Sequence, residues 1–149
     1  MATTYNFTDG SIAGAITPRV KTAEENEVFF LRNIVDFSLQ TIEATATDTA
    51  QVINIPAGTT VLTAWLRVIT AETANGTVDL GYGGDPDVWG VALAVDGAAG
   101  SLLGYLRVPL YFSATDTIDI LATTDTGTVD IDGLKVEVVA MCVKNLSAF

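Results

Sequence analysis

The sequence predicts an all-β protein, an antiparallel two-sheet sandwich of jelly-roll-like form with an N-terminal arm. Short apolar runs alternate at period two through most of the chain, as in strands with one buried face. These runs stop at turn residues such as Pro56-Ala57-Gly58 and Asn75-Gly76. No long helical period is present. About eight strands are expected, and they pack most naturally as two sheets of about four strands each.

Length and composition predict one folded domain behind an arm. With 149 residues the chain can bury a sizeable core without disulfide bonds. Residues 1–27 lack a sustained period, and we expect an extended arm with one short strand; a helix over residues 22–27 is the alternative. The sandwich domain is expected over residues 28–149. The apolar patch at residues 12–16 is too short for a signal peptide or membrane span, so we expect a soluble protein without a secretory leader.

The first long strand is predicted over residues 28–37, and a long connection is predicted over residues 38–50. The alternation in this strand defines two faces: Phe29, Leu31, Asn33 and Val35 on one, and Phe30, Arg32 and Ile34 on the other.

A further strand is predicted over residues 61–69, with one core face and one mixed face. The core set is expected to be Leu62, Ala64, Leu66 and Val68, and the opposite set Val61, Thr63, Trp65, Arg67 and Ile69. A face that combines Trp with Arg is typical of a half-covered or contact surface.

The middle of the chain is predicted to form a strand followed by loops. Residues 77–82 alternate, with Val78, Leu80 and Tyr82 directed inward. Residues 83–87 form a Gly- and Asp-containing loop, and the small-residue stretch 92–100 is expected to be a loop or a short helical turn.

Residues 103–112 are predicted to form one long strand, and a hairpin is predicted beyond it. Pro109 cannot donate a ladder hydrogen bond, so the strand should lie at an edge or carry a bulge. The hairpin should pair residues 118–120 with residues 129–131 across the turn at 123–127.

The last strand is predicted to have two apolar faces. The inward phase breaks at Asp132-Gly133 and resumes at Leu134, which indicates a glycine-based bulge within a continuing strand. Beyond Val138 the second face is apolar too, so an arm or another subunit should cover it. We therefore predict an interaction surface formed by the following residues: Trp65, Arg67, Ile69, Val139, Met141 and Val143.

The residue types predict no catalytic, cofactor or metal site. The chain has no histidine, which removes the common Ser-His-Asp and Cys-His systems and the ordinary zinc site. Asp119, Asp130 and Asp132 alternate with apolar residues, so we expect them on solvent-facing strand surfaces. Cys142 stands in an apolar run and is expected to be a buried thiol. With 18 acidic and seven scattered basic residues, a net charge of −11 argues against a nucleic-acid partner.

Two ligand-binding alternatives remain open at this point. Trp65, Tyr82 and Trp89 could stack on a sugar beside the Asp85–Asp87 loop, which would make the protein a carbohydrate-binding module. A glycosidase would also need two carboxyl groups across the sugar, and the sequence offers three acidic pairs: Asp116 with Asp119, Asp130 with Asp132, and Asp85 with Asp87. The same loop could offer oxygen ligands to Ca²⁺, although it lacks the spacing of an EF-hand.

Several segments of the chain resemble a known protein family. These are residues 31–38 (LRNIVDFS), 50–59 (AQVINIPAGT) and 61–70, followed by residues 76–81, 113–120 and 133–143. Together they resemble small structural proteins of tailed-bacteriophage virions, of the capsid decoration or cement type. Tail- or fibre-associated virion proteins share the same pattern.

The resemblance implies a β-sandwich that self-associates, commonly as a homotrimer. It implies that the protein is made in the host cytoplasm and binds to the capsid exterior, where it clamps neighbouring major capsid proteins. It supplies no catalytic residues, and it implies neither a nucleic-acid nor a membrane partner. The contact elements expected on this basis are the arm over residues 2–27 and the second faces of residues 61–69 and 138–143.

Overall fold

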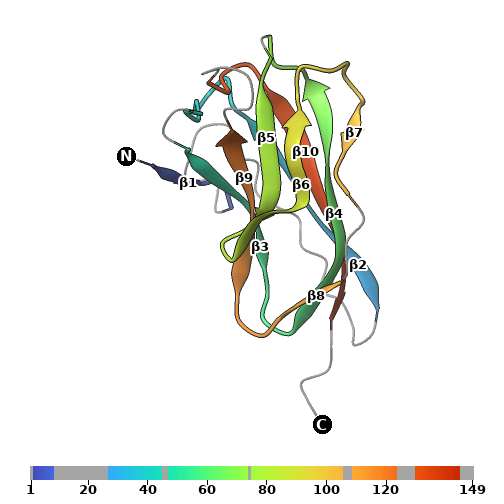
Figure 1. Cartoon of the computed structure of the whole chain (residues 1–149). Coiled ribbons are helices and arrows are strands. Elements are labelled where there is room, and N and C mark those ends of the chain that lie inside the picture. The colour runs from blue at the N-terminus through green and yellow to red at the C-terminus, as the bar shows by residue number, and fades with distance from the viewer. Residues whose placement is uncertain are drawn as a thin grey trace.

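Two β-sheets pack face to face in a computed structural model of the chain (Figure 1). The structure describes residues 2–8, 27–44, 47–73, 75–105, 109–123 and 130–144. Sheet A has the strand order β1 (Thr4–Asn6), β3 (Thr49–Ile55), β9 (Asp116–Thr123), β5 (Thr77–Tyr82) and β6 (Asp85–Ala94). Sheet B has the order β2 (Val28–Asp36), β10 (Lys135–Lys144), β4 (Thr59–Thr70) and β7 (Leu102–Leu103), and β8 (Leu110–Phe112) also pairs with β4.

The strand pattern confirms the predicted all-β, two-sheet sandwich. The described residues form ten strands and no helix. The strand pairs are antiparallel except for β1, which runs parallel to β3. Most connections cross from one sheet to the other, as in jelly-roll-like sandwiches. β1 is a short strand within the predicted arm, whereas residues 9–26, including most of the alternative helix, lie outside the described residues.

The core lies between the two sheets and is built from alternate residues of each strand. In β2 the predicted faces are confirmed, because Phe29, Leu31 and Val35 are buried and Phe30 and Arg32 are exposed. On β10 and β9 the buried inner sets are Val136, Val138, Ala140 and Cys142, and Ile118, Ile120 and Ala122. Burial of these apolar side chains supplies the main driving force for association of the two sheets.

Asn33 is a polar residue of this core that ties the two sheets together. Its Nδ2 donates to the carbonyl oxygens of Val52 in β3 at 2.8 Å and of Phe7 at 3.1 Å, and its Oδ1 accepts from the Ile34 backbone N–H at 2.9 Å. Asn33 is only 4% exposed, so these bonds replace those that water would make in the unfolded chain. One side chain of sheet B therefore holds both sheet A and the segment after β1.

Asp48, which precedes β3, also anchors the start of β1. Its carboxylate accepts the Thr3 backbone N–H at 2.7 Å and the Glu43 backbone N–H at 3.1 Å, and its own carbonyl oxygen accepts from Ala122. β1 is thus fixed by a buried carboxylate as well as by its pairing with β3.

The predicted core set of residues 61–69 is wrong at its start because β4 carries a bulge. Met141 lies opposite Thr63, but Cys142 lies opposite Val61, which leaves Leu62 as the extra residue. Val61 is therefore buried and Leu62 only half-buried, while Ala64, Leu66 and Val68 point inward as predicted.

The predicted hairpin between residues 118–120 and 129–131 is also wrong. β9 is already paired on both sides, with β3 and with β5. Ile131 instead forms an isolated bridge with Ile42. The predicted turn at 123–127 lies, apart from Thr123, outside the described residues.

Asp132-Gly133 is not a bulge within one strand, because both residues lie between the isolated bridge at Ile131 and the start of β10. β10 begins only at Lys135 and belongs to sheet B, whereas β9 belongs to sheet A. The backbone N–H groups of Asp132 and Gly133 donate to the Glu72 carboxylate at 3.1 and 3.0 Å. A buried glutamate side chain therefore fixes the chain just before β10.

The predicted long strand over residues 103–112 is replaced by two short ones. β7 and β8 pair separately with β4, so the edge position inferred from Pro109 is confirmed although the continuous strand is not. Gly104 follows β7 with a φ of +146°, a conformation that residues with a side chain rarely adopt. Residues 92–94, predicted as loop, form the end of β6.

We predict that Asn33→Ala lowers the free energy of unfolding by about 3 kcal/mol, because the carbonyls of Phe7 and Val52 would remain buried without this donor. Urea denaturation of the variant measures this loss. Asn54→Ala, which truncates an exposed asparagine on β3, is the matched control and should change stability by less than about 0.5 kcal/mol. Equal stability of the two variants would show that the inter-sheet hydrogen bonds contribute nothing.

Candidate interaction surface

The outer face of sheet B brings most of the predicted interface residues together. In register, β10 lies between β2 and β4, so that Val139 has Arg32 on one side and Trp65 on the other. We define the outer face of sheet B by these residues: Val28, Phe30, Arg32 and Ile34 of β2, Glu137, Val139, Met141 and Val143 of β10, Trp65 and Arg67 of β4, and Leu102 of β7.

Four of the six predicted residues lie close together on this face, and a fifth lies at its end. Trp65, Arg67, Val139 and Met141 occupy neighbouring positions on β4 and β10, and Val143 follows beside Thr60. Ile69 sits at a register shift, since Lys135 lies opposite Thr70 and Val136 opposite Val68. Their role in contacts stays a prediction.

An ion-pair cluster crosses three strands of the face. Oε2 of Glu137 accepts from Nε and Nη2 of Arg67 in β4, both at 2.9 Å. Oε1 of Glu137 accepts from Nη2 of Arg32 in β2. The Glu137 side chain is 6% exposed, whereas those of Arg32 and Arg67 are 59% and 45% exposed. One carboxylate thus holds two guanidinium groups, and the cluster carries a net charge of about +1 on a strongly acidic protein.

Apolar side chains surround this cluster. The rings of Phe30 and Trp65 meet edge to face with centroids 6.5 Å apart, across the strand that carries Val139 and Met141. Phe30 is 49% exposed, Val28 50% and Leu102 66%. Aromatic and apolar residues around arginines form the typical composition of the centre of a protein–protein interface.

Sequence reasoning missed Glu137 and all the residues that β2 and β7 contribute to this face. Phe30 shares a predicted strand face with Arg32, but nothing in the sequence placed that strand beside residues 135–144. Glu137 lies between apolar residues of a predicted strand and gave no sign that two arginines would meet it. Leu102 lies opposite Arg67 only because β7 adds to the edge of β4.

The predicted sugar-binding aromatics do not form one site. Trp89 is fully buried and packs against Tyr82, with ring centroids 6.1 Å apart, so it belongs to the core. Trp65 lies on the other sheet, on the outer face beside Phe30. Stacking on one sugar needs exposed rings on a shared surface, so the carbohydrate-binding alternative is wrong.

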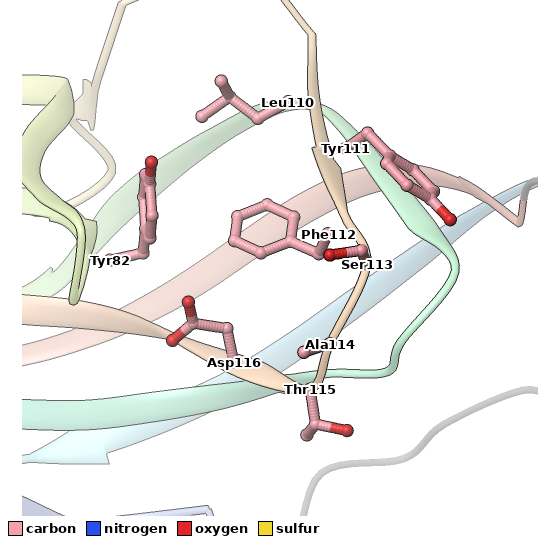
Figure 2. A pocket seen from close by; sticks show the side chains of 8 residues that line it. All are labelled: Tyr82, Leu110, Tyr111, Phe112, Ser113, Ala114, Thr115 and Asp116. Carbon is pink, nitrogen blue, oxygen red and sulfur yellow. The ribbon is translucent and has the colours of Figure 1, made fainter.

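A shallow hollow of about 200 Å³ lies beside β8 and is lined by Tyr82 and residues 110–116 (Figure 2). Phe112 points toward the ring of Tyr82 there, and the two rings make an edge-to-face contact with centroids 5.2 Å apart. Asp116 contributes a carboxylate, but its Oδ1 already accepts the Thr117 backbone N–H. Its lining combines hydroxyl side chains with the apolar side chains of Leu110 and Phe112.

Within the described ranges, no three His, Cys, Asp or Glu side chains lie close enough to hold a metal ion. Gly83 and Gly84 form the tight turn of the β5–β6 hairpin, in which Tyr82 lies opposite Asp85. Among all the described residues, no helix is long and apolar enough to cross a membrane.

Cys142 is a buried free thiol, as predicted, and burial raises its pKa to about 12.

The predicted exposure of Asp119 to solvent is wrong. It is 6% exposed, and its Oδ1 has no hydrogen-bond partner among the described residues. Burial is the main cause that raises the pKa of this carboxyl to about 6. The negative charge of Asp116 raises the pKa further, whereas the hydrogen bond from Thr117 lowers it. Asp130 and Asp132 are exposed, as predicted.

The burial of Asp119 follows from an irregular stretch of β6. Asp119 lies opposite Gly81, and residues 86–89 of β6 all face this one glycine, because Gly90 pairs with Leu80 and Asp85 with Tyr82. The backbone of Asp85 and Pro86 packs so closely on Gly81 that a Cβ atom there would collide. The crowded backbone beside Asp119 keeps water away from its carboxyl group.

The arrangement of strands defines the class of the fold, a jelly-roll-like β-sandwich of two sheets. Two solved structures contain chains of similar fold. A chain of the cyanophage Pam1 capsid asymmetric unit aligns with a TM-score of 0.59 and 19% identity, covering 88% of this chain and 94% of that one. A chain of the capsid of Ralstonia phage GP4 aligns with a TM-score of 0.59 and 15% identity, covering 97% of this chain and 99% of that one.

No family model and no curated protein matches the sequence. At 19% and 15% identity the likeness to the two capsid chains concerns the fold. It extends over nearly the whole of each chain, so the shared unit is the entire sandwich.

We predict that Asp119→Asn stabilises the protein at pH 7 and has little effect near pH 4. The folded-state pKa of about 6 exceeds the ordinary carboxyl value of 3.8, so the folded chain holds a proton that the unfolded chain releases between these values. Wild-type stability is therefore lost through this group as the pH rises from about 4 to about 6, by up to about 3 kcal/mol. Urea denaturation of both proteins from pH 4 to pH 8 measures the difference.

Asp132→Asn, at an exposed carboxyl group, is the control for the change in net charge. Its stability difference from the wild type should stay nearly constant over the same range. If Asp119→Asn behaved in the same way, Asp119 would be ionised and solvated in the folded protein.

Proposed function

We propose that the protein is a non-catalytic structural component of a tailed-phage virion. More specifically, it would be a capsid decoration or cement subunit that binds on the capsid exterior across major capsid proteins and self-associates as a homotrimer. The observation that carries the proposal is the outer face of sheet B, which presents exposed aromatic and aliphatic side chains around two arginines. A face of this composition suits burial in an assembly better than exposure to water.

The structural neighbours support this proposal through their source and their length. Both were found in phage capsids, and nearly the whole of each neighbouring chain aligns with this one. A self-contained sandwich of this size can add to a shell as a separate subunit.

The charge of the chain suits a role outside the shell. A net charge of −11 with scattered basic residues gives little affinity for packaged nucleic acid. The same charge keeps free subunits soluble before they bind.

Stabilisation of a shell by such a subunit follows from mass action. A subunit that binds the assembled shell, and not its dissociated parts, shifts the equilibrium toward the shell by RT ln(1 + [L]/Kd) for each site. At a free concentration of about 100 times Kd this amounts to about 2.7 kcal/mol per site. This stabilisation needs no chemical step.

The test uses shells assembled from the major capsid protein encoded with this chain. We predict that the wild-type protein co-sediments with these shells and raises the temperature at which they dissociate. Trp65→Ser should weaken binding at least tenfold, because it removes the largest apolar side chain of the outer face.

Leu39→Ser is the matched control, since Leu39 is 59% exposed but lies outside the outer face of sheet B. It should bind shells like the wild type. If the wild-type protein neither co-sediments with the shells nor changes their dissociation temperature, the decoration role is refuted.

A further inference from the structure

We propose that the hollow beside β8 is a binding pocket for an arginine side chain of a major capsid protein. This inference rests on the proposed function and deepens it, because a subunit that binds across two neighbouring capsid proteins needs a second contact surface. The outer face of sheet B supplies one surface, and none of its residues lines the hollow. The hollow is therefore a separate place at which a partner can be held.

Both sheets contribute to the walls of the hollow. Tyr82 ends β5 and Asp116 begins β9, both in sheet A, whereas Leu110 and Phe112 belong to β8, which pairs with β4 of sheet B (Figure 1). The space between these side chains is about 200 Å³. Pockets for drug-sized ligands measure about 300–1,000 Å³, so this smaller space suits a single side chain.

Asp116 supplies the charge that selects the ligand. Its Oδ1 accepts the Thr117 backbone N–H at 2.8 Å, which fixes the orientation of the carboxylate. Within the described part of the chain, no ion pair engages Asp116 and no basic side chain lines the hollow. The charge of Asp119 is near enough to interact with that of Asp116, so the local potential is negative. A cation is the complement of such a site.

The aromatic rings beside the carboxylate favour a guanidinium group over an ammonium group. Figure 2 shows Asp116 below the edge-to-face contact of Tyr82 and Phe112. A guanidinium group is planar, stacks on aromatic rings and is more weakly hydrated than an ammonium group, so it loses less on leaving water. The Ser113 hydroxyl in the same lining offers a further acceptor for its five N–H donors.

Charge favours another protein, and not a second copy of this chain, as the source of the arginine. The described arginines of this chain, Arg32 and Arg67, are both held by Glu137 on the outer face of sheet B. Two copies that each carry a net charge of −11 also repel one another. A capsid protein that inserts an arginine meets an acidic subunit, and this complementarity assists binding.

An NMR titration of the isotope-labelled free protein with N-acetyl-arginine amide tests the pocket without a shell. We expect saturable shifts of Tyr82 and residues 110–117. The corresponding citrulline amide, which has nearly the same shape and no charge, should cause no saturable shift, and the lysine amide should bind several-fold more weakly.

Asp116→Asn should weaken binding of the arginine amide at least about fivefold, because it removes the charge of the pocket. Its Oδ1 can still accept the Thr117 N–H, so the local structure is kept. Asp132→Asn, at an exposed carboxyl group outside the hollow, is the matched control and should bind the amide like the wild type.

Co-sedimentation with shells then tests the partner. Asp116→Asn should weaken shell binding at least about fivefold, whereas Asp132→Asn should leave it unchanged. The inference is overturned if the arginine amide shows no saturable binding, if the citrulline or lysine amide binds equally well, or if Asp116→Asn binds shells like the wild type. The last result would leave the proposed function standing, whereas a wild-type protein that binds no shells would refute both.

Discussion

The association of the two sheets across a shared apolar core is the interaction on which the rest of this structure depends. Strands of both sheets contribute alternate residues to it, and Asn33 adds hydrogen bonds from β2 to the opposite sheet. Because Asn33 reaches both Val52 and Phe7, it fixes the position of sheet B relative to β3 and to the chain after β1. The outer face of sheet B is held in place by the same core that lies beneath it.

Much of the fold follows from the alternation of residues, and the departures have identifiable causes. The faces of β2 were predictable because no bulge interrupts them. The phase of β4 changes at Leu62, where one extra residue faces β10, and a single strand carries no signal of its partner's register. At Asp132-Gly133 the alternation breaks in the same way whether one strand bulges or two strands belong to different sheets, and only the pairing of β9 and β10 distinguishes the two.

For the candidate surface too, the sequence predicts the faces of single strands but not which strands are neighbours. Trp65, Val139 and Met141 were predictable because apolar residues occupied a second strand face. The ion pairs of Glu137 with Arg32 and Arg67 depend on which strands are neighbours, and residues separated by 105 positions in sequence cannot be matched from one chain. Asp119 was correctly assigned to the face opposite the core, but its burial depends on the irregular pairing of β6 around Gly81.

The lone thiol of Cys142 gives the protein a built-in reporter. Cys142 lies on the inner side of β10, between β2 and β4, and its high pKa keeps it unreactive while the sheet is closed. A thiol-specific reagent can therefore modify it only when the central strand separates from the core. The rate of that modification would measure how often sheet B opens, in the free subunit and in any assembly that covers its outer face.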